Sequence, residues 1–149
     1  MKHVESILFV INKSNTDAYR DIIPPQHFQD PVLTLDKLLE EFECMIFYTY
    51  RLEDKLVGVA ALKVEKNQLG CIRWVHVLPE HQRKGIGTSL IKHIEKEGEK
   101  MRLKKFRVLY VRQRADWARN FYTKLGYKIG DRVILPWGEY AYIYEKDLT

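Results

Sequence analysis

The stretch LPEHQRKGIGTSL (78–90) brings together residues whose types and spacing suit anion binding. It follows an apolar run, and a helical pattern begins near Gly85. The first amides of a helix have no partner within the helix and lie at its positive end, so such a junction favours phosphate. Gly85 and Gly87 let the backbone come close to a ligand, and Arg83 and Lys84 add positive charge. The stretch therefore predicts a phosphate-binding loop.

Two common classes of phosphate-binding loop do not match this stretch. The GxxxxGK[ST] pattern of nucleoside triphosphatases is absent, and the dinucleotide pattern GxGxxG is incomplete because Leu90 stands where the third glycine belongs. A dinucleotide loop also follows the first strand of its fold, whereas this stretch follows the fourth expected strand. Both classes are therefore disfavoured.

Composition bounds the class of protein. The 149 residues are 46% apolar and 30% charged, which is typical of one soluble globular domain, here expected to span 1–149. Cys44 and Cys71 have no partners at metal-ligand spacing, which predicts no metal site and fits a reducing cytosol. The N-terminal apolar run Ile7–Ile11 is too short for a signal segment or a membrane span. We therefore expect a cytoplasmic protein without a membrane partner.

The charge is distributed unevenly along the chain. Residues 1–70 hold 8 basic and 11 acidic side chains, whereas residues 71–149 hold 17 basic and 9 acidic ones, within a net charge of +5. One interpretation is that the C-terminal half receives an anion and the N-terminal half a cation. The alternative is a set of solvated helix faces.

The elements that must position the loop follow from hydrophobic periodicity and turn signals. In order, we expect a strand at Ser6–Ile11, helices at Thr16–Ile23 and Leu35–Glu43, strands at Met45–Leu52, Lys55–Val64 and Cys71–Leu78, a helix at Ile86–Met101, a strand at Phe106–Val111, a helix at Asp116–Leu125, and strands at Lys128–Leu135 and Gly138–Lys146. The helix that joins the fourth and fifth strands predicts that these two are parallel. The expected class is α/β (α+β), with a mixed, mostly antiparallel central sheet of six to seven strands and helices on both faces.

Three of the expected helices have an apolar stripe on one face. The stripes are Leu35, Leu38, Leu39 and Phe42 in the first helix, Ile86, Leu90, Ile91 and Ile94 in the second, and Trp117, Phe121 and Leu125 in the third. Thr34 is expected to cap the first of these helices at its N-terminus.

Two segments resemble the signatures of the GNAT superfamily of N-acetyltransferases. Gln82–Gly87 (QRKGIG) resembles the [QR]-x-x-G-x-[GA] pyrophosphate loop, and Asp116–Tyr127 (DWARNFYTKLGY) resembles the helix that ends in a form such as FYEKLGF. Element order and spacing match over nearly the whole chain. The resemblance implies a GNAT-like fold, acetyl-CoA as the acyl donor, and direct attack by a primary amine in a ternary complex.

The resemblance also implies the site residues. The pantetheine arm of CoA would bond the backbone of Val75 and Val77, and the Val77 amide would polarise the thioester oxygen. Tyr122 would protonate the departing sulfur, and Asn120 would replace an asparagine that the family often has at Ala115. The residues implied for the pyrophosphate are Gln82, Arg83, Lys84, Gly85, Ile86, Gly87 and Thr88.

One departure concerns the general base. Many members of the family have a glutamate on the fourth strand, where this chain has Arg73 and Trp74. His76 is the only side chain of this strand with a suitable ordinary pKa and is the candidate base. The alternatives are that His76 is a packed histidine, and that the amine arrives neutral or loses its proton through water.

In the family, the acceptor site is built from segments that correspond to Thr16–Glu43 and Trp137–Tyr144. The first segment is acidic, which would suit a cationic small molecule such as a polyamine or aminoglycoside, a lysine side chain or a protein N-terminus. A second hypothesis is a non-catalytic acyl-CoA-binding sensor or interaction module of the same fold. Nucleic-acid binding by the basic half is disfavoured, because the phosphates of CoA explain that charge more economically. We expect a monomer or a homodimer.

Overall fold

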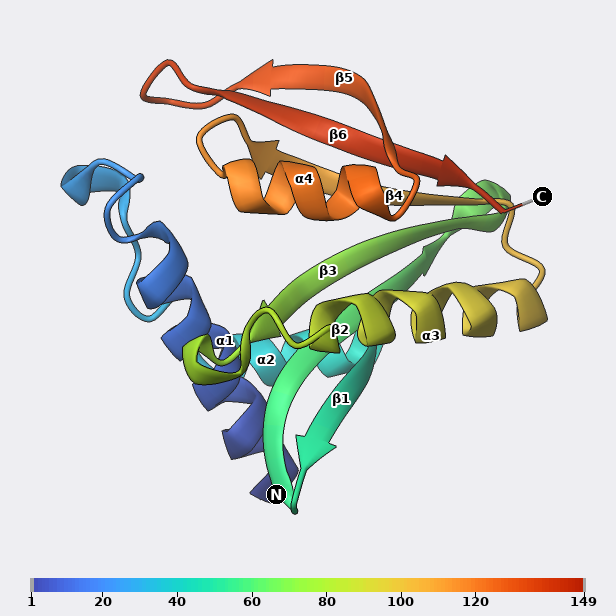
Figure 1. Ribbon diagram of the computed structural model, residues 1–149, viewed down its shortest axis with the longest axis horizontal. Helices are drawn as coiled ribbons and strands as arrows, with labels where there is room; N and C mark the ends of the chain where they lie inside the picture. The colour runs from blue at the N-terminus through green and yellow to red at the C-terminus, as the bar shows by residue number, and fades with distance from the viewer. Residues whose placement is uncertain (1, 149) are drawn as a thin grey trace. The chain divides into compact units, whose positions relative to one another are not determined.

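The structure is a computed structural model that describes residues 2–148. Figure 1 shows the order of its elements. These are α1 (Lys2–Tyr19), α2 (Leu35–Cys44), β1 (Ile46–Leu52), β2 (Lys55–Glu65), β3 (Leu69–Val77), α3 (Ile86–Lys100), β4 (Lys105–Arg112), α4 (Asp116–Lys124), β5 (Lys128–Ile134) and β6 (Tyr140–Asp147), with short 3₁₀ turns at Pro25–His27, Lys66–Gln68 and Pro79–His81.

The strands form a six-stranded sheet in the order β1-β2-β3-β4-β6-β5. β3 and β4 are parallel, with Leu69 opposite Lys105 and Ile72 opposite Val108, as the connecting helix predicts. The pairs β1/β2, β4/β6 and β5/β6 are antiparallel. The mixed α/β class and the mostly antiparallel sheet are therefore confirmed.

The chain divides into two compact units, which are described separately. The first unit comprises Met1–Lys63 and Trp74–Ile94, and the second comprises Val64–Arg73 and Glu95–Thr149. The elements β2, β3 and α3 contribute residues to both units.

The expected strand at Ser6–Ile11 is wrong, because this segment lies within α1, an 18-residue helix. The expected turn at Asn12–Asn15 and the start of the helix expected at Thr16–Ile23 also belong to α1, which ends at Tyr19. The buried positions Ile7, Val10, Ile11 and Ser14 follow the helical period, whereas Phe9 is 59% exposed. A short β-branched and aromatic run suits a strand, but the longer amphipathic period prevails, and six strands remain instead of seven.

The helix α2 confirms its expected cap but not its expected buried face. The Thr34 hydroxyl accepts a hydrogen bond of 3.3 Å from the amide of Lys37. Leu38 is fully buried, but Leu35 and Leu39 are about two-fifths exposed, at 41% and 42%. The buried residue on the next turn is Glu41, which is 8% exposed. The helix therefore packs with a carboxylate on its inner face.

In the second unit, glycines make room for Phe106, which is fully buried on β4. A Cβ at Gly70 of β3 would lie 2.6 Å from the Phe106 ring, and Gly98 of α3 lies against the same ring. The expected stripe of α4 is wrong at Trp117, which is 47% exposed. The buried aromatic residue of α4 is Tyr122, so the inward face of this helix differs from the face that carries Trp117.

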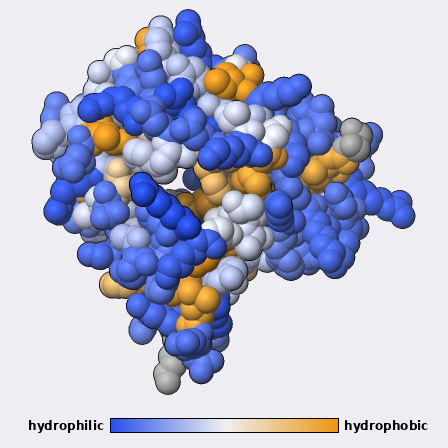
Figure 2. Space-filling view, viewed as in Figure 1, coloured by the Kyte–Doolittle hydropathy of each residue, from blue (hydrophilic) through white to orange (hydrophobic). Residues whose placement is uncertain are grey.

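The exposed surface is largely hydrophilic on the face shown in Figure 2, where apolar residues appear as separate patches. Within residues 2–148, no helix is both long and apolar enough to cross a membrane.

Candidate active site

The loop from Gln82 to Gly85 lies in the first unit, between the 3₁₀ turn Pro79–His81 that follows β3 and the start of α3. Gly85 has a φ of 80°, in the left-handed region, and a Cβ built there would meet no atom within 4 Å. The side chains of Arg83 and Lys84 are exposed. The loop is therefore open, basic and adjacent to the unpaired amides of a helix N-terminus, which suits a phosphate group.

The side chain of Gln82 connects this loop to the end of β3 by a hydrogen bond. Its Nε2 donates a hydrogen bond of 3.1 Å to the carbonyl oxygen of Val77. Ile86 and Leu90 are buried and anchor the first turn of α3. A Cβ at Gly58 of β2 would lie 2.8 Å from Ile86 Cγ2, so the glycine allows this helix to approach the strand. Gly58 is a positioning residue that the sequence patterns did not reveal.

The strand β3 carries the other predicted residues of the first unit. Val75, His76 and Val77 are half-buried. Trp74 has a φ of 54°, which is rare for a residue other than glycine and interrupts the regular strand. Its indole Nε1 donates a hydrogen bond of 3.3 Å to Glu41 Oε1.

His76 has a specific partner and a strongly lowered pKa. Its Nδ1 lies 3.1 Å from the hydroxyl oxygen of Ser14, a buried residue of α1. Part of the residue remains accessible, but it lies deep among protein atoms, and burial lowers the pKa of His76 from 6.5 to about 4. The imidazole is therefore neutral at pH 7. The contact with Ser14 was not predicted from the sequence, because the segment that contains Ser14 was expected to be a turn.

The second unit contains the other predicted residues, Tyr122 and Asn120. Tyr122 is 6% exposed, whereas Asn120 is exposed on the same helix. The centroid of the Tyr122 ring lies 5.8 Å from that of Tyr127 and 6.2 Å from that of Tyr144. This aromatic cluster fixes the position of the Tyr122 ring.

A polar network supports the aromatic cluster. The Tyr127 hydroxyl donates a hydrogen bond of 2.7 Å to Glu95 Oε2. Lys146 Nζ lies 3.1 Å from the same oxygen and donates a hydrogen bond of 2.7 Å to the carbonyl oxygen of Leu125. Burial and the hydrogen bond to Glu95 raise the pKa of Tyr127 above its ordinary value. Tyr127 is therefore a protonated structural donor at neutral pH.

A hollow of about 650 Å³ lies in the second unit, beside the hairpin that precedes β6. Glu139 is buried there and accepts a hydrogen bond of 2.7 Å from the Arg114 amide and one of 2.8 Å from Trp137 Nε1. The hairpin expected to contribute to an acceptor site borders this shallow, open hollow. Its lining residues are Gln113, Arg114, Asp116, Arg119, Trp137, Gly138 and Glu139. Among residues 2–148, no group of three or more His, Cys, Asp or Glu side chains could hold a metal ion.

Comparison with solved structures shows the fold. An N-acetyltransferase named PaiA from Thermoplasma acidophilum, solved with coenzyme A, has a TM-score of 0.84 at 22% identity, covering 98% of this chain and 93% of its own. The ribosomal-protein-S18-alanine N-acetyltransferase from Escherichia coli has a TM-score of 0.78 at 17% identity, covering 100% and 90%. An aminoglycoside 6'-N-acetyltransferase complexed with coenzyme A has a TM-score of 0.76 at 14% identity, covering 98% and 91%.

A search of curated proteins finds no match. The family model described as Acetyltransferase (GNAT) family matches residues 11–127, which is more than half of the chain and includes both predicted signatures. The protein is therefore a member of the GNAT acetyltransferase family.

Proposed function

We propose that the protein is an N-acetyltransferase that moves the acetyl group of acetyl-CoA to a primary amine. The observation that carries the proposal is the open, basic glycine loop Gln82–Thr88 at the N-terminus of α3, in a chain of this family. Two of the similar structures contain coenzyme A, which supports the donor. The pyrophosphate would take backbone amides between Arg83 and Thr88, with countercharge from Arg83 and Lys84.

The reaction is a direct transfer within a ternary complex. The neutral amine attacks the thioester carbon, the C–N bond forms, the C–S bond breaks to give the CoA thiolate, and the nitrogen loses a proton to water as the amide forms. The backbone of Val75 and Val77 would align the pantetheine arm, and the Val77 amide would donate to the developing oxyanion. Asn120 would add a polar contact to the pantetheine arm.

Tyr122 is the proposed acid that delivers a proton to the departing thiolate. Its fixed ring position in the aromatic cluster supports this role, since a proton donor must be held in one place. His76, the base expected from the sequence, would receive the amine's proton only weakly, because its pKa is lowered to about 4.

The acceptor is proposed to be a cationic amine. Acidic side chains are frequent in the segment that includes α2, and the similar structures include enzymes named for a protein alanine and for an aminoglycoside. The panel to test therefore contains spermidine, an aminoglycoside, a peptide with an N-terminal alanine and a lysine peptide with a blocked N-terminus.

A thiol-release assay with acetyl-CoA and this panel tests the proposal. We expect turnover with at least one amine, and a loss of about 100-fold in kcat for Tyr122→Phe. Calorimetric titration of acetyl-CoA is the accompanying binding measurement. Tight binding without thiol release from any amine would instead favour the non-catalytic acyl-CoA-binding module, and the absence of binding would refute the donor assignment.

A further inference from the structure

The shallow hollow of the second unit lies between two segments that are hydrogen-bonded to each other. One segment is the turn between β4 and α4, and the other is the tip of the β5–β6 hairpin. The Gln113 amide donates a hydrogen bond of 2.9 Å to the carbonyl oxygen of Tyr140, and the Arg114 amide donates one of 2.7 Å to Glu139 Oε2. The walls of the hollow are therefore fixed relative to each other.

The two acidic residues that line the hollow already accept hydrogen bonds from the protein. Glu139 is 8% exposed, and its Oε1 accepts a hydrogen bond of 2.8 Å from Trp137 Nε1. Its Oε2 accepts the hydrogen bond from the Arg114 amide. Asp116 Oδ1 accepts a hydrogen bond of 2.5 Å from Arg119 Nη2. Glu139 therefore stabilises the wall, and Arg119 compensates part of the charge of Asp116.

The positive charge of the hollow comes from arginine. Arg114 and Arg119 line it, and no lysine does so within residues 2–148. A guanidinium can donate two parallel hydrogen bonds to one carboxylate, whereas a lysine ammonium is a point charge. The Nε–H of Arg119 is buried and has no hydrogen-bond partner in the described part of the chain. A small rotation of this side chain, which is 34% exposed, would bring that donor to an oxygen of a ligand.

Other lining groups suit a polypeptide rather than a simple anion. Trp137 is half-buried, so part of its indole ring is accessible to the apolar carbons of a partner side chain. Tryptophan and arginine are enriched at the positions that contribute most to binding in protein interfaces. A peptide with acidic side chains offers carboxylates to the two arginines. It also offers backbone N–H groups to Asp116, whose side chain is 76% exposed.

The mixed charge of the hollow favours a peptide over a nucleic acid. A surface that binds nucleic acid neutralises a continuous run of phosphates with several lysines and arginines. Here the exposed carboxylate of Asp116 lies directly beside Arg119, where it would repel a continuous phosphate backbone. A peptide can place separate carboxylates beside the arginines and leave Asp116 to an N–H group.

We propose that this hollow is a docking site for an acidic segment of a polypeptide partner. Carboxylates of the segment pair with Arg114 and Arg119, and an apolar part of the segment packs against Trp137. The contact is open to water, so a short peptide alone binds weakly, with a Kd of about 1 mM. The hollow shares no residue with the glycine loop Gln82–Thr88, which lies in the first unit. The inference concerns binding and does not depend on the proposed transfer.

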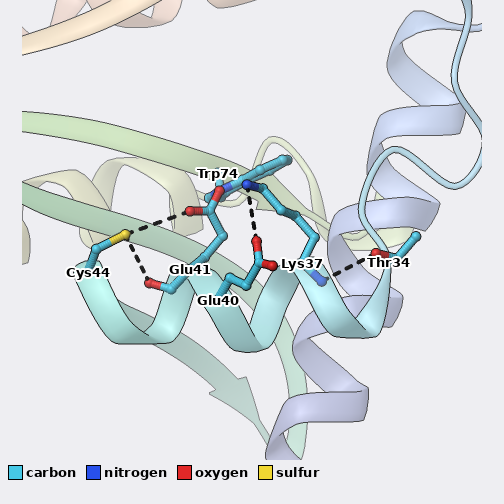
Figure 3. A network of polar contacts seen from close by, with 6 residues as sticks. All are labelled: Thr34, Lys37, Glu40, Glu41, Cys44 and Trp74. Carbon is cyan, nitrogen blue, oxygen red and sulfur yellow. Dashed lines mark hydrogen bonds and ion pairs between the residues drawn. The ribbon is translucent and has the colours of Figure 1, made fainter.

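An NMR titration of the ¹⁵N-labelled full chain at low salt tests the inference. The probe is a tetrapeptide of glutamate blocked at both ends, and the matched control is the corresponding peptide of glutamine. The reporter is the indole N–H signal of Trp137. The reference is the indole N–H signal of Trp74, whose Nε1 donates a hydrogen bond of 3.3 Å to Glu41 Oε1 in the first unit (Figure 3). Spectra of Trp137→Phe assign the two signals.

The glutamate peptide should shift the Trp137 signal saturably, whereas the Trp74 signal should not move. The glutamine peptide should shift neither signal. Arg119→Gln and Arg114→Gln each remove one guanidinium from the hollow and should each raise the Kd of the glutamate peptide by about fivefold or more.

Arg102→Gln is the matched control, because Arg102 is an exposed arginine of the same unit and its replacement changes the net charge equally. Its Kd should change by less than about twofold. If Arg119→Gln does not fold, Arg114→Gln decides the question, since it keeps the backbone amide that bonds Glu139.

The inference is overturned if the glutamate peptide causes no saturable shift up to about 10 mM, or if the glutamine peptide causes the same shift. Equal changes of Kd in the hollow variants and in Arg102→Gln would overturn it as well, because net charge alone would then explain the binding. Inorganic phosphate that shifts the Trp137 signal equally at the same concentration would show a site for simple anions instead. Oligothymidylate that shifts this signal at lower concentration than the glutamate peptide would replace the peptide by a nucleic acid.

Discussion

The Tyr127 hydroxyl lies 2.7 Å from Glu95 Oε2, although the two residues are 32 positions apart in the sequence. The bond joins α3 to the residue that directly follows the left-handed Gly126 at the end of α4. Glu95 is also paired with Lys146, so the carboxylate has both a neutral and a charged partner.

Replacing Tyr127 by Phe removes the hydroxyl and keeps the ring. We expect the free energy of unfolding to fall by about 1–3 kcal/mol, because a buried hydrogen bond to a charged group is lost. Urea denaturation measures the change. Tyr110→Phe is the control, since Tyr110 is 56% exposed, and its expected change is below about 0.5 kcal/mol. Equal losses in the two variants would show that the bond to Glu95 contributes nothing.

The lowered pKa of His76 predicts how the free energy of unfolding depends on pH. Its pKa is about 4 in the folded protein, against the ordinary histidine value of 6.5 that applies to the unfolded chain, so the unfolded chain binds the proton more strongly between these values. The contribution of His76 is therefore complete above pH 6.5 and is lost as the pH falls towards 4. Between pH 7 and pH 5 the loss should be about 2 kcal/mol.

The measurement is urea unfolding of the wild type and of His76→Asn at both pH values. The variant has no titrating imidazole, so its free energy of unfolding should change less between pH 7 and pH 5 than that of the wild type. An identical pH dependence in the two proteins would rule out His76 as its source.

The close contact between Gly58 and Ile86 predicts that a larger residue at position 58 would disturb the packing at the start of α3. In Gly58→Ala the new Cβ would lie 2.8 Å from Ile86 Cγ2, so the helix start must shift. We expect a loss of about 1–3 kcal/mol in the free energy of unfolding and weaker acetyl-CoA binding. Gly130→Ala is the control, because the nearest atom to its new Cβ is Glu145 Oε1, at the end of a long side chain and 3.1 Å away. An equally mild effect at both glycines would contradict the packing argument.

The left-handed backbone conformation of Gly85 predicts that other residues at this position would strain the loop. A Cβ there has space, but a φ of 80° costs most L-residues about 1–2 kcal/mol. Gly85→Ala should therefore weaken acetyl-CoA binding by about tenfold, whereas Gly85→Asn should weaken it less because asparagine tolerates this region better. Titration calorimetry measures both Kd values. Unchanged binding in Gly85→Ala would argue against a role of this conformation in the proposed donor site.

The sequence predicted the structure best at features that depend on neighbouring residues. The glycine loop follows β3 and opens α3 as predicted, and Thr34 caps α2. The parallel pairing of β3 and β4 also followed from the connecting helix alone. Capping and turn formation depend on residues within a few positions of one another, and a helix between two consecutive strands favours their parallel pairing, so the sequence alone was sufficient for these features.

Secondary structure was predicted wrongly where one short run of residues was compatible with both a strand and a helix. Residues 6–11 have strand propensity, but they lie in α1, whose buried face continues past Ile11 with the polar residues Ser14 and Asn15. The apolar stripe of α2 likewise suggested Leu35 and Leu39, whereas packing buried Glu41. Propensity is a weak guide in such runs, since burial of one face in the folded protein contributes more.

The sequence by itself therefore determined the strand, loop and helix that would hold a phosphate, the order of most of the elements, and the likeness to one family. Only the tertiary structure decided which side chains meet: His76 with Ser14 across 62 positions, and Trp74 with Glu41 across 33. The same holds for burial, which lowers the pKa of His76. These properties depend on which faces of distant elements pack together and on how much water they exclude, and no local pattern specifies either.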